Sequence, residues 1–269
     1  MLRLRAVFIG FGISALGLAG CNGVLGDLGI TTTPTNTKAS PTGIWNGTDS
    51  ANNLQLAAII NSSGQAYFYR SDGVIFAGVV QVAGTTLAAT VDGYTVYPVQ
   101  QFADGSTYGV GTLNGTVTTG ATMTATLSFT TDGGSAIDGD WSLTYSLLSG
   151  DASSLTAITG NYRDIDASPA TLADTTLSIS GAGVLSAQVA ANGCVLNGTV
   201  TTDDASFDVY QVSYTLASCT GEYAVLNGVQ FTGLAIVNSS ASPTEIVLAV
   251  SGQSTTGVNY GIWSVLNLT

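Results

Sequence analysis

Strict alternation of apolar and hydroxyl side chains is the sequence feature that most limits how this chain can fold. Met123, Ala125, Leu127 and Phe129 alternate with Thr and Ser through residues 122–129. The same period of two recurs in residues 210–216, and Ile246, Leu248 and Val250 form a third apolar stripe. Successive side chains of a strand point to opposite faces, so this pattern predicts half-buried antiparallel strands. Helical periodicity is nearly lacking from residue 43 onward, and we therefore expect an all-β fold.

Turn signals divide these strands at intervals of about ten residues. They are dipeptides in which Gly supplies the positive φ that tight hairpin turns require. These dipeptides are Ser63-Gly64, Asp72-Gly73, Asp92-Gly93, Asp104-Gly105, Asn192-Gly193 and Asn227-Gly228. Such spacing is typical of a meander, a sandwich or a barrel and argues against βαβ units.

The chain repeats itself at an offset of about 120 residues, which predicts two tandem units. Gly43-Ile44-Trp45 corresponds to Gly160-Asn161-Tyr162, and Trp141-Ser142 to Trp263-Ser264. Two further correspondences lie between them, in the same order: Gly64 with Gly183, and Asp72-Gly73-Val74 with Asn192-Gly193-Cys194. We expect β-meander units in residues 43–150 and 151–269, each a small barrel or sandwich of about eight strands. The first unit's strands are expected near 43–48, 54–60, 65–70, 74–82, 86–91, 107–119, 121–130 and 140–147.

A second echo relates residues 113–119 to residues 196–202, which share the sequence Leu-Asn-Gly-Thr-Val-Thr-Thr. It is out of frame with the main repeat. It indicates either shorter, hairpin-level repetition or strands that resemble one another because the composition is narrow.

The amino-terminal residues predict export from the cytoplasm. Arg3 and Arg5 precede an uncharged stretch, residues 6–19, that is too short to span a bilayer as a helix. The run Leu18-Ala19-Gly20-Cys21 resembles a bacterial lipobox, which implies a signal peptide over residues 1–20 and lipidation of Cys21. Asn22 after the cysteine implies, by the same resemblance, the outer membrane of the cell envelope, on its periplasmic or surface face. An ordinary signal peptide that happens to precede a cysteine is the alternative.

Residues 21–42 are expected to contain the lipidated cysteine and a Thr/Pro-rich tether without apolar periodicity. About 20 residues of flexible chain reach roughly 25 Å, which would hold the folded units just clear of the lipid headgroups.

Gly43-x-Trp45 at the start of an eight-stranded meander is similar to the opening of calycins such as lipocalins and avidins. The resemblance covers only this tripeptide and the strand count, and the second unit has Tyr162 in place of the tryptophan. It implies a barrel that the tryptophan plugs at one end while a ligand enters at the other. No ligand residues are carried over.

The charge balance argues against nucleic acid as a partner. Without Arg3 and Arg5, three basic residues (Lys38, Arg70 and Arg163) remain against 17 acidic ones. Such a surface repels phosphate backbones.

Cys194 and Cys219 remain once Cys21 is assigned to the anchor, and a pair of cysteines in an exported protein predicts a disulfide. A free reactive thiol is the alternative. Nothing basic lies nearby in the sequence to lower the pKa of either thiol.

The chain contains no histidine, and its one lysine, Lys38, lies in the predicted tether. The lack of histidine excludes Ser-His-Asp and Cys-His catalysis and the usual zinc sites. Schiff-base chemistry is poorly supported, because the only lysine lies in the tether. We expect a protein that is not an enzyme and has neither cofactor nor bound metal.

Three weaker patterns have both a functional and a structural interpretation. Asp138 with Asp140, and Asp164 with Asp166, place carboxylates two residues apart, as calcium binding or acid/base catalysis would need, but Asp at strand ends more often serves turns.

Three tripeptides match glycosylation sequons and are expected to mark turns: Asn46-Gly47-Thr48, Asn114-Gly115-Thr116 and Asn197-Gly198-Thr199. Aromatic residues on the strands would line a pocket or a sugar-binding face, or pack in the core. These aromatic residues are Tyr67, Phe68, Tyr69, Tyr94, Tyr97, Tyr108, Tyr210 and Tyr214.

These observations favour a lipid-anchored envelope protein that serves as a non-enzymatic binding, adhesion or structural module. The alternative is a calycin-like carrier of a small apolar or sugar-like ligand in one or both barrels. The expected partners are the membrane, through Cys21, and an envelope protein, a glycan or a small molecule.

Overall fold

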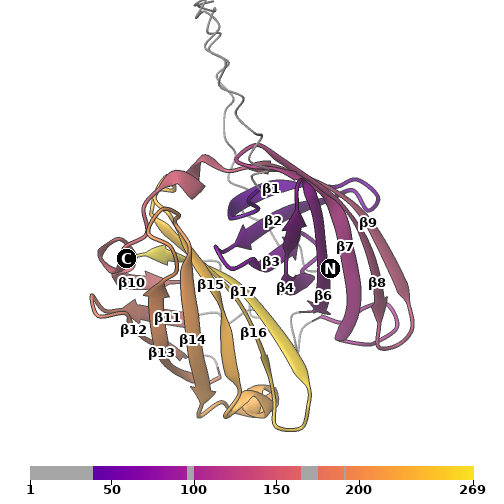
Figure 1. Ribbon diagram of the computed structural model, residues 1–269. Coiled ribbons are helices and arrows are strands. Elements are labelled where there is room, and N and C mark those ends of the chain that lie inside the picture. Colours follow the sequence, from indigo (N-terminus) through magenta and orange to yellow (C-terminus); the bar gives the residue numbers. More distant parts are fainter. Residues whose placement is uncertain (1–38, 96–99, 165–174, 191) are drawn as a thin grey trace, which may run out of the picture.

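The protein consists of two closed, eight-stranded antiparallel barrels that follow one another in the chain and lie side by side (Figure 1). The computed structural model describes residues 39–269 except 96–99, 165–174 and 191. The predicted signal peptide, Cys21, most of the tether, Tyr97 and Asp166 lie outside these residues. In the part of the chain that is described, no helix is both long and apolar enough to cross a bilayer.

The first barrel is a meander that closes on itself. Its strands are β1 (Gly43–Asp49), β2 (Leu54–Ile60), β3 (Gln65–Arg70), β4 (Ile75–Val79), β5 (Gln81–Ala83), β6 (Thr86–Tyr94), β7 (Tyr108–Thr118), β8 (Thr122–Thr131) and β9 (Ala136–Tyr145). Pairing of β1 with β9 and of β4 with β6 closes the ring. The short β5 pairs with β6 outside that ring.

The second barrel has the same antiparallel order without an extra strand. Its strands are β10 (Gly160–Arg163), β11 (Thr175–Ile179), β12 (Val184–Val189), β13 (Val195–Thr202), β14 (Tyr210–Ala217), β15 (Gln230–Asn238), β16 (Glu245–Gln253) and β17 (Asn259–Leu268). It closes where β10 pairs with β17, Tyr162 opposite Leu268. Three short helices, η1 (Leu147–Gly150), α1 (Leu155–Ile158) and η2 (Gly221–Leu226), complete the described elements.

The prediction of two all-β units of about eight strands each is confirmed, and both units are barrels. The expected strand 74–82 is divided into β4 and β5 at Val80, whose backbone N–H donates to the carbonyl of Gly64 across 2.8 Å. This bond continues the β3–β4 register, in which Gln65 lies opposite Val79, and beyond it β5 pairs with β6 alone.

Alternation places one apolar set of side chains inside each barrel. Met123, Leu127 and Phe129 on β8 are buried, whereas Thr122, Thr124 and the other hydroxyl residues between them are exposed. An eight-stranded barrel has an interior that side chains can fill or that can hold one small ligand. The buried inward side chains form one contiguous cluster in each barrel, around Trp45, Phe68 and Phe129 in the first and Tyr162, Tyr210 and Phe231 in the second.

The expectation that the Asn-Gly-Thr tripeptides mark turns is wrong, because all three lie within strands, on β1, β7 and β13. At each glycine the neighbouring strand comes very close. A Cβ on Gly47, Gly115 or Gly198 would collide with the carbonyl oxygen of Ser142, Thr124 or Ser213, respectively. Glycine in a strand interior commonly marks such a close approach or bend. The echo between residues 113–119 and 196–202 therefore reflects one local strand geometry used in both barrels.

Two of the sequence correspondences between the units are also structural. Gly64 and Gly183 both have positive φ, +87° and +76°, and their carbonyls accept from the backbone N–H of Val80 and Val200 at 2.8 Å. The indole Nε1–H of Trp45 donates to the carbonyl of Pro41, and the hydroxyl of Tyr162 donates to that of Ile158. Each first strand is thus tied to the segment four residues before it.

The correspondence between Trp141 and Trp263 is wrong by one residue. Trp45 pairs with Tyr145 and Tyr162 with Leu268, so the residue equivalent to Trp141 is Ser264. Because a shift of one residue exchanges the faces of a strand, Trp141 lies inside the first barrel and Trp263 lies on the outside of the second.

Candidate functional site

Each barrel has one end that its own chain covers, which we call the capped end. Residues 39–42, assigned to the tether from sequence, cover this end of the first barrel: the N–H of Ala39 donates to the carbonyl of Gly84, and that of Ser40 to Thr119 Oγ1. In the second barrel, α1 takes this place, with Ile158 buried in the core. The opposite end of the first barrel, formed by turns 50–53, 71–74 and 132–135 and by the β6–β7 connection, is called the loop end.

A buried ion cluster occupies the loop end of the first barrel. Arg70, on the inner face of β3, donates to both carboxylate oxygens of Asp72, from Nε at 3.0 Å and from Nη2 at 2.8 Å. Its Nη1 lies 3.5 Å from Asp49 Oδ2, and the Asp49 side chain has no exposed surface. Because isolated charges are costly to bury, these three groups depend on one another.

Asp49 has further donors, which explains why its charge is tolerated in the barrel. Asn52 Nδ2 donates to Oδ2 at 2.8 Å, and the backbone N–H of Asp140 donates to Oδ1 at 3.2 Å. The guanidinium of Arg70 also lies 5.6 Å from the ring centroid of Phe76, a distance at which the ring quadrupole attracts a cation.

Trp141 is the one residue of this region with an unused polar group. Its Nε1–H is buried and has no hydrogen-bond acceptor among the described atoms. The indole packs against Phe68 at 5.2 Å and Phe76 at 5.5 Å between ring centroids. A Cβ on Gly139 would lie 2.7 Å from Nε1 and 3.0 Å from Asp49 Oδ2, so the donor and the carboxylate face the same glycine. A ligand that reached this point would meet one free donor and one carboxylate.

The carboxylate pairs and aromatic residues predicted from the sequence did not identify this cluster. One other feature of the sequence could have done so. Arg70 continues the inward set Ala66 and Phe68 and is one of only three basic residues outside the signal peptide. A cation at a position that alternation predicts to be buried requires carboxylate partners.

Hydrogen bonds also hold two further carboxylates at the loop end, those of exposed Asp104 and half-buried Asp92. Asp104 accepts from the Ser106 hydroxyl at 2.6 Å, from its N–H at 3.0 Å and from Thr131, and these donors hold the Asp104 pKa well below its usual range. The Tyr108 hydroxyl donates to Asp92 at 2.5 Å, and burial, followed by this bond, raises the Tyr108 pKa.

The predicted carboxylate pairs do not assemble into a metal site in the described part of the chain. Asp138 and Asp140 lie on the same outward face of β9, as their spacing predicts, and both are exposed. No group of three or more Asp, Glu, Cys or His side chains is suitably placed for a metal among the described residues. Asp164 is half-buried, and its predicted partner Asp166 lies outside the described residues.

The predicted aromatic residues pack in the protein. Phe68, Tyr210 and Tyr214 belong to the barrel cores. Tyr67, Tyr69, Tyr94 and Tyr108 instead point out of the first barrel and pack against the second. They join a third apolar cluster between the barrels, completed by Ile44, Ile59, Ile75, Ala77, Leu148, Val209, Leu234, Ile236, Val247 and Ala249. The expectation that the strand with Ile246, Leu248 and Val250 is half-buried is wrong, because residues 246–250 of β16 are buried on both faces. The continuous apolar runs in residues 56–60 and 246–250 were the available signal, since strands buried on both faces lose their alternation.

Specific contacts set the position of one barrel against the other. Tyr69 stacks on Trp263 with 5.1 Å between ring centroids, and Tyr94 lies against Gly261, where a Cβ would be 2.7 Å from the Tyr94 Cβ. At the capped ends, Asp203 accepts from the N–H of Ser62 at 3.0 Å and from its hydroxyl at 2.8 Å. The two capped ends therefore lie on the same side of the molecule.

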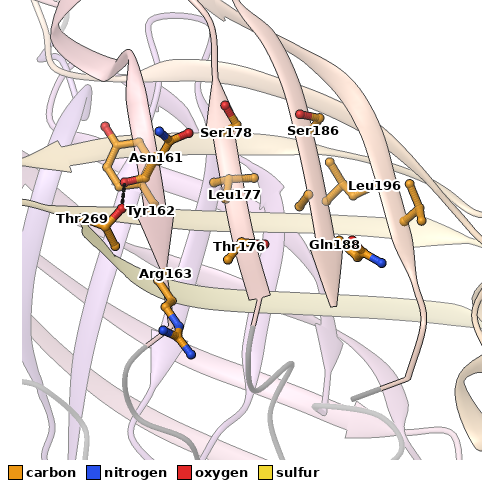
Figure 2. A pocket seen from close by; sticks show the side chains of 12 residues that line it. Asn161, Tyr162, Arg163, Thr176, Leu177, Ser178, Ser186, Gln188, Leu196 and Thr269 are labelled. Atoms are coloured by element: carbon orange, nitrogen blue, oxygen red, sulfur yellow. Dashed lines mark hydrogen bonds between the residues drawn. The ribbon is translucent and has the colours of Figure 1, made fainter. Parts of the chain in front are cut away.

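A groove of about 620 Å³ runs over strands β10 to β13 on the outside of the second barrel. Figure 2 shows hydroxyl and amide side chains along it, including Asn161, Ser178, Ser186 and Gln188. Thr269 bounds it, donating from N–H (2.9 Å) and Oγ1 (3.1 Å) to the carbonyl of Asn161. These groups and the guanidinium of Arg163 can hydrogen-bond a polar ligand, and the lining contains no carboxylate for acid/base catalysis.

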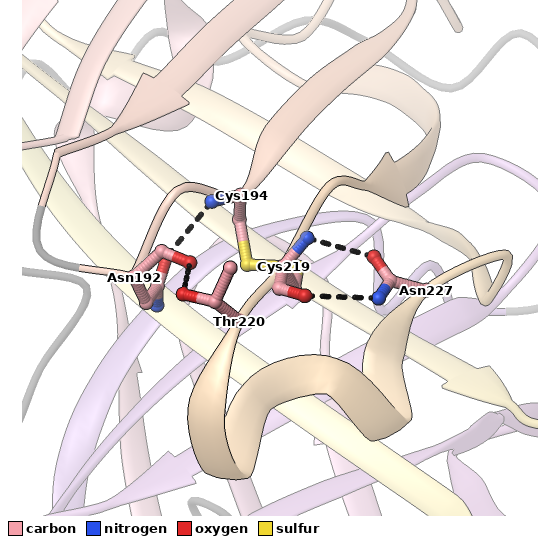
Figure 3. Close-up of a disulfide and its surroundings, with 5 residues drawn as sticks. All are labelled: Asn192, Cys194, Cys219, Thr220 and Asn227. Carbon is pink, nitrogen blue, oxygen red and sulfur yellow. Dashed lines mark hydrogen bonds between the residues drawn. A yellow bond between two sulfur atoms is a disulfide. The ribbon is translucent and has the colours of Figure 1, made fainter.

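A disulfide between Cys194 and Cys219 closes the second barrel at the end opposite α1 (Figure 3). The pairing is as predicted. Asn192 accepts from the N–H of Cys194 at 3.0 Å, and Asn227 accepts from the N–H of Cys219 at 2.8 Å and donates to its carbonyl at 3.0 Å. The two asparagines tie the turn before β13 and helix η2 to the bridge, which gives it a structural role.

No protein-family model matches this chain, and no curated protein matches it.

Proposed function

We propose that the protein is a lipid-anchored component of the bacterial cell envelope that acts as a non-enzymatic binding, adhesion or structural module. One observation carries the anchor, the lipobox-like run Leu18-Ala19-Gly20-Cys21. The described chain then enters the first barrel at its capped end, where the N–H of Ala39 donates to the carbonyl of Gly84. A chain tethered through Cys21 would present the loop end of the first barrel and the disulfide end of the second away from the membrane.

The state of the charged groups supports a binding or structural role over catalysis. Arg70, Asp49 and Asp72 are engaged with one another, and the groove over β10 to β13 has hydroxyls, amides and the Arg163 guanidinium but no carboxylate. These groups hold the fold or offer hydrogen bonds. An envelope protein or a glycan suits such surfaces.

Replacing the proposed lipidation site tests the anchor. Cys21→Ser should move the protein from the membrane fraction to the soluble periplasmic fraction, because a protein without acyl chains has no stable attachment. The double variant Cys194→Ser/Cys219→Ser is the matched control and should stay in the membrane fraction. Membrane retention of Cys21→Ser would refute the anchor.

A carrier function is the second candidate, and the unpartnered Nε1–H of Trp141 inside the first barrel favours it. An interior donor without an acceptor suits a small ligand with a carbonyl, hydroxyl or similar oxygen. Native mass spectrometry of the protein from its own envelope should then find a bound mass that Trp141→Phe reduces. Equal binding by the variant, or no bound mass in either protein, would oppose this candidate.

A further inference from the structure

The groove on the outside of the second barrel crosses its strands (Figure 2). Two rows of outward side chains border it, one of Asn161, Ser178 and Ser186 and the other of Arg163, Thr176, Gln188 and Val195. Two positions along each strand separate the rows, which therefore lie about 7 Å apart, and four strands make the groove roughly 15 Å long. The floor between the rows is the backbone of residues whose side chains point into the barrel: Tyr162, Leu177, Ala187 and Leu196.

The hydroxyl and amide groups along the groove are available to a ligand. Thr176, Ser178, Ser186 and Gln188 are exposed, and no hydrogen bond joins their side chains to another residue in the described part of the chain. The carboxylates at the loop end of the first barrel, by contrast, are held by donors of their own chain. A hydroxyl or an amide can both donate and accept. Two rows of such groups therefore suit a ligand that carries several hydroxyl groups.

A peptide strand has no free backbone to pair with along this groove. β11 pairs with β10 and β12, and β13 pairs with β12 and β14. The other side of β10 is taken by β17 and by the hydrogen bond from the N–H of Thr269 to the carbonyl of Asn161. Addition of a strand requires an unpaired edge, so a ligand in this groove is held by side chains.

The strands beneath the groove contain no acidic residue. None of the 17 acidic residues of the chain lies in β10, β11, β12, β13 or β14. Arg163 is the one charged residue of the lining, and Asp164 follows it directly, so the charges at this end of the groove balance. A net-acidic protein also repels anions at long range. The groove therefore favours an uncharged ligand.

We infer that this groove binds a neutral oligosaccharide that lies across β10 to β13. The inference rests on the proposed binding function and gives it a site and a ligand class. The hydroxyl groups of the sugars meet the two polar rows, and their ring carbons contact the floor, Val195 and the aliphatic part of Gln188. The volume of about 620 Å³ is typical of sites for small molecules.

Saturation-transfer NMR on the full acylated protein tests this site. The protein is held in micelles of a detergent without a sugar headgroup, and the neutral probes are cellotriose, maltotriose and triacetylchitotriose. Transfer to at least one of them is expected. Ser178→Trp fills the middle of the groove and should weaken binding at least tenfold. Ser128→Trp is the matched control, because Ser128 is exposed on β8 of the first barrel, and it should leave binding unchanged.

Removal of hydroxyl groups provides a second readout that adds no bulk. Ser178→Ala with Ser186→Ala should weaken binding severalfold. Ser128→Ala with Ser142→Ala, which changes two exposed serines of the first barrel, should not. Thermal unfolding at the wild-type temperature in all four variants shows that a loss of binding does not come from misfolding.

The outcomes separate this inference from the function on which it rests. Lack of transfer to all three neutral probes would overturn the oligosaccharide site. Transfer that neither Ser178→Trp nor the Ser178/Ser186 alanine pair reduces would place the sugar elsewhere, which overturns the groove and keeps a binding function. Stronger transfer to the acidic trisaccharide trigalacturonate would overturn the neutral ligand class. The fractionation of Cys21→Ser tests the anchor independently of these results.

Discussion

The hydroxyl of Tyr67 in the first barrel donates to the backbone carbonyl of Thr232 in the second barrel across 2.8 Å. It also lies 3.1 Å from Ser251 Oγ, so one side chain on β3 contacts two neighbouring strands of the other barrel. Tyr67 is 2% exposed, and burial raises its pKa. The two barrels thus share one desolvated interface.

Tyr67→Phe should lower the free energy of unfolding by about 1–2 kcal/mol, because it leaves the Thr232 carbonyl without its buried donor. Urea denaturation monitored by fluorescence measures the change. Tyr223→Phe, on the half-buried face of η2, is the control and should change stability by less than about 0.5 kcal/mol. Equal losses in the two variants would contradict the role of Tyr67 at the interface.

Gly115→Ala should destabilise the protein by about 1–3 kcal/mol or more, because the added methyl group would meet the Thr124 carbonyl oxygen on the paired strand. Gly150→Ala is the matched control, since no atom lies within 4 Å of the position of its Cβ. Thermal unfolding of both variants gives the comparison. Wild-type stability in Gly115→Ala would show that the strands separate at little cost.

Arg70→Met should cost about 3–5 kcal/mol, because it leaves the fully buried Asp49 without its cation. Adding Asp49→Asn removes the orphaned charge and should recover part of the loss. Chemical denaturation of the single and double variants measures this recovery. A double variant less stable than Arg70→Met would mean that Asp49 stabilises the barrel through its other hydrogen bonds.

Asp208 should make the protein less stable as the pH rises. Asp208 is 3% exposed, and burial raises its pKa to about 7. The hydrogen bond from the N–H of Val237 at 3.0 Å opposes this rise, and the charge of Asp151 adds to it. The folded state therefore holds this proton more tightly than the unfolded chain does. The contribution of protonated Asp208 to the free energy of unfolding is fully present below the pKa of the unfolded chain, about 4. Up to about 4 kcal/mol of it is lost as the pH rises through 7.

Asp208→Asn should flatten this dependence, because the amide keeps an oxygen acceptor for Val237 and does not ionise. Urea unfolding between pH 4 and pH 8 compares it with Asp138→Asn, which changes an exposed carboxylate on β9. An unchanged pH profile in Asp208→Asn would assign the dependence to another group.

The sequence alone determined the all-β class, the two antiparallel units of about eight strands each and the pairing of Cys194 with Cys219. These features depend on relations that are local or few in number: side chains two residues apart, a glycine in a hairpin turn, and two cysteines left after the predicted anchor is assigned. They held even where the repeat was misaligned by one residue at Trp141 and Trp263.

Only the tertiary structure decided which outward faces are buried, where the close approaches of strands lie and which charges meet. Tyr67 and Thr232 are 165 residues apart, and Arg70 reaches Asp49 only because β1, β2 and β3 curve around one core. Alternation distinguishes the two faces of a strand, but it does not say whether water or a second barrel covers the outer one. That choice depends on the shape of two closed barrels, a property of contacts between residues far apart in the chain.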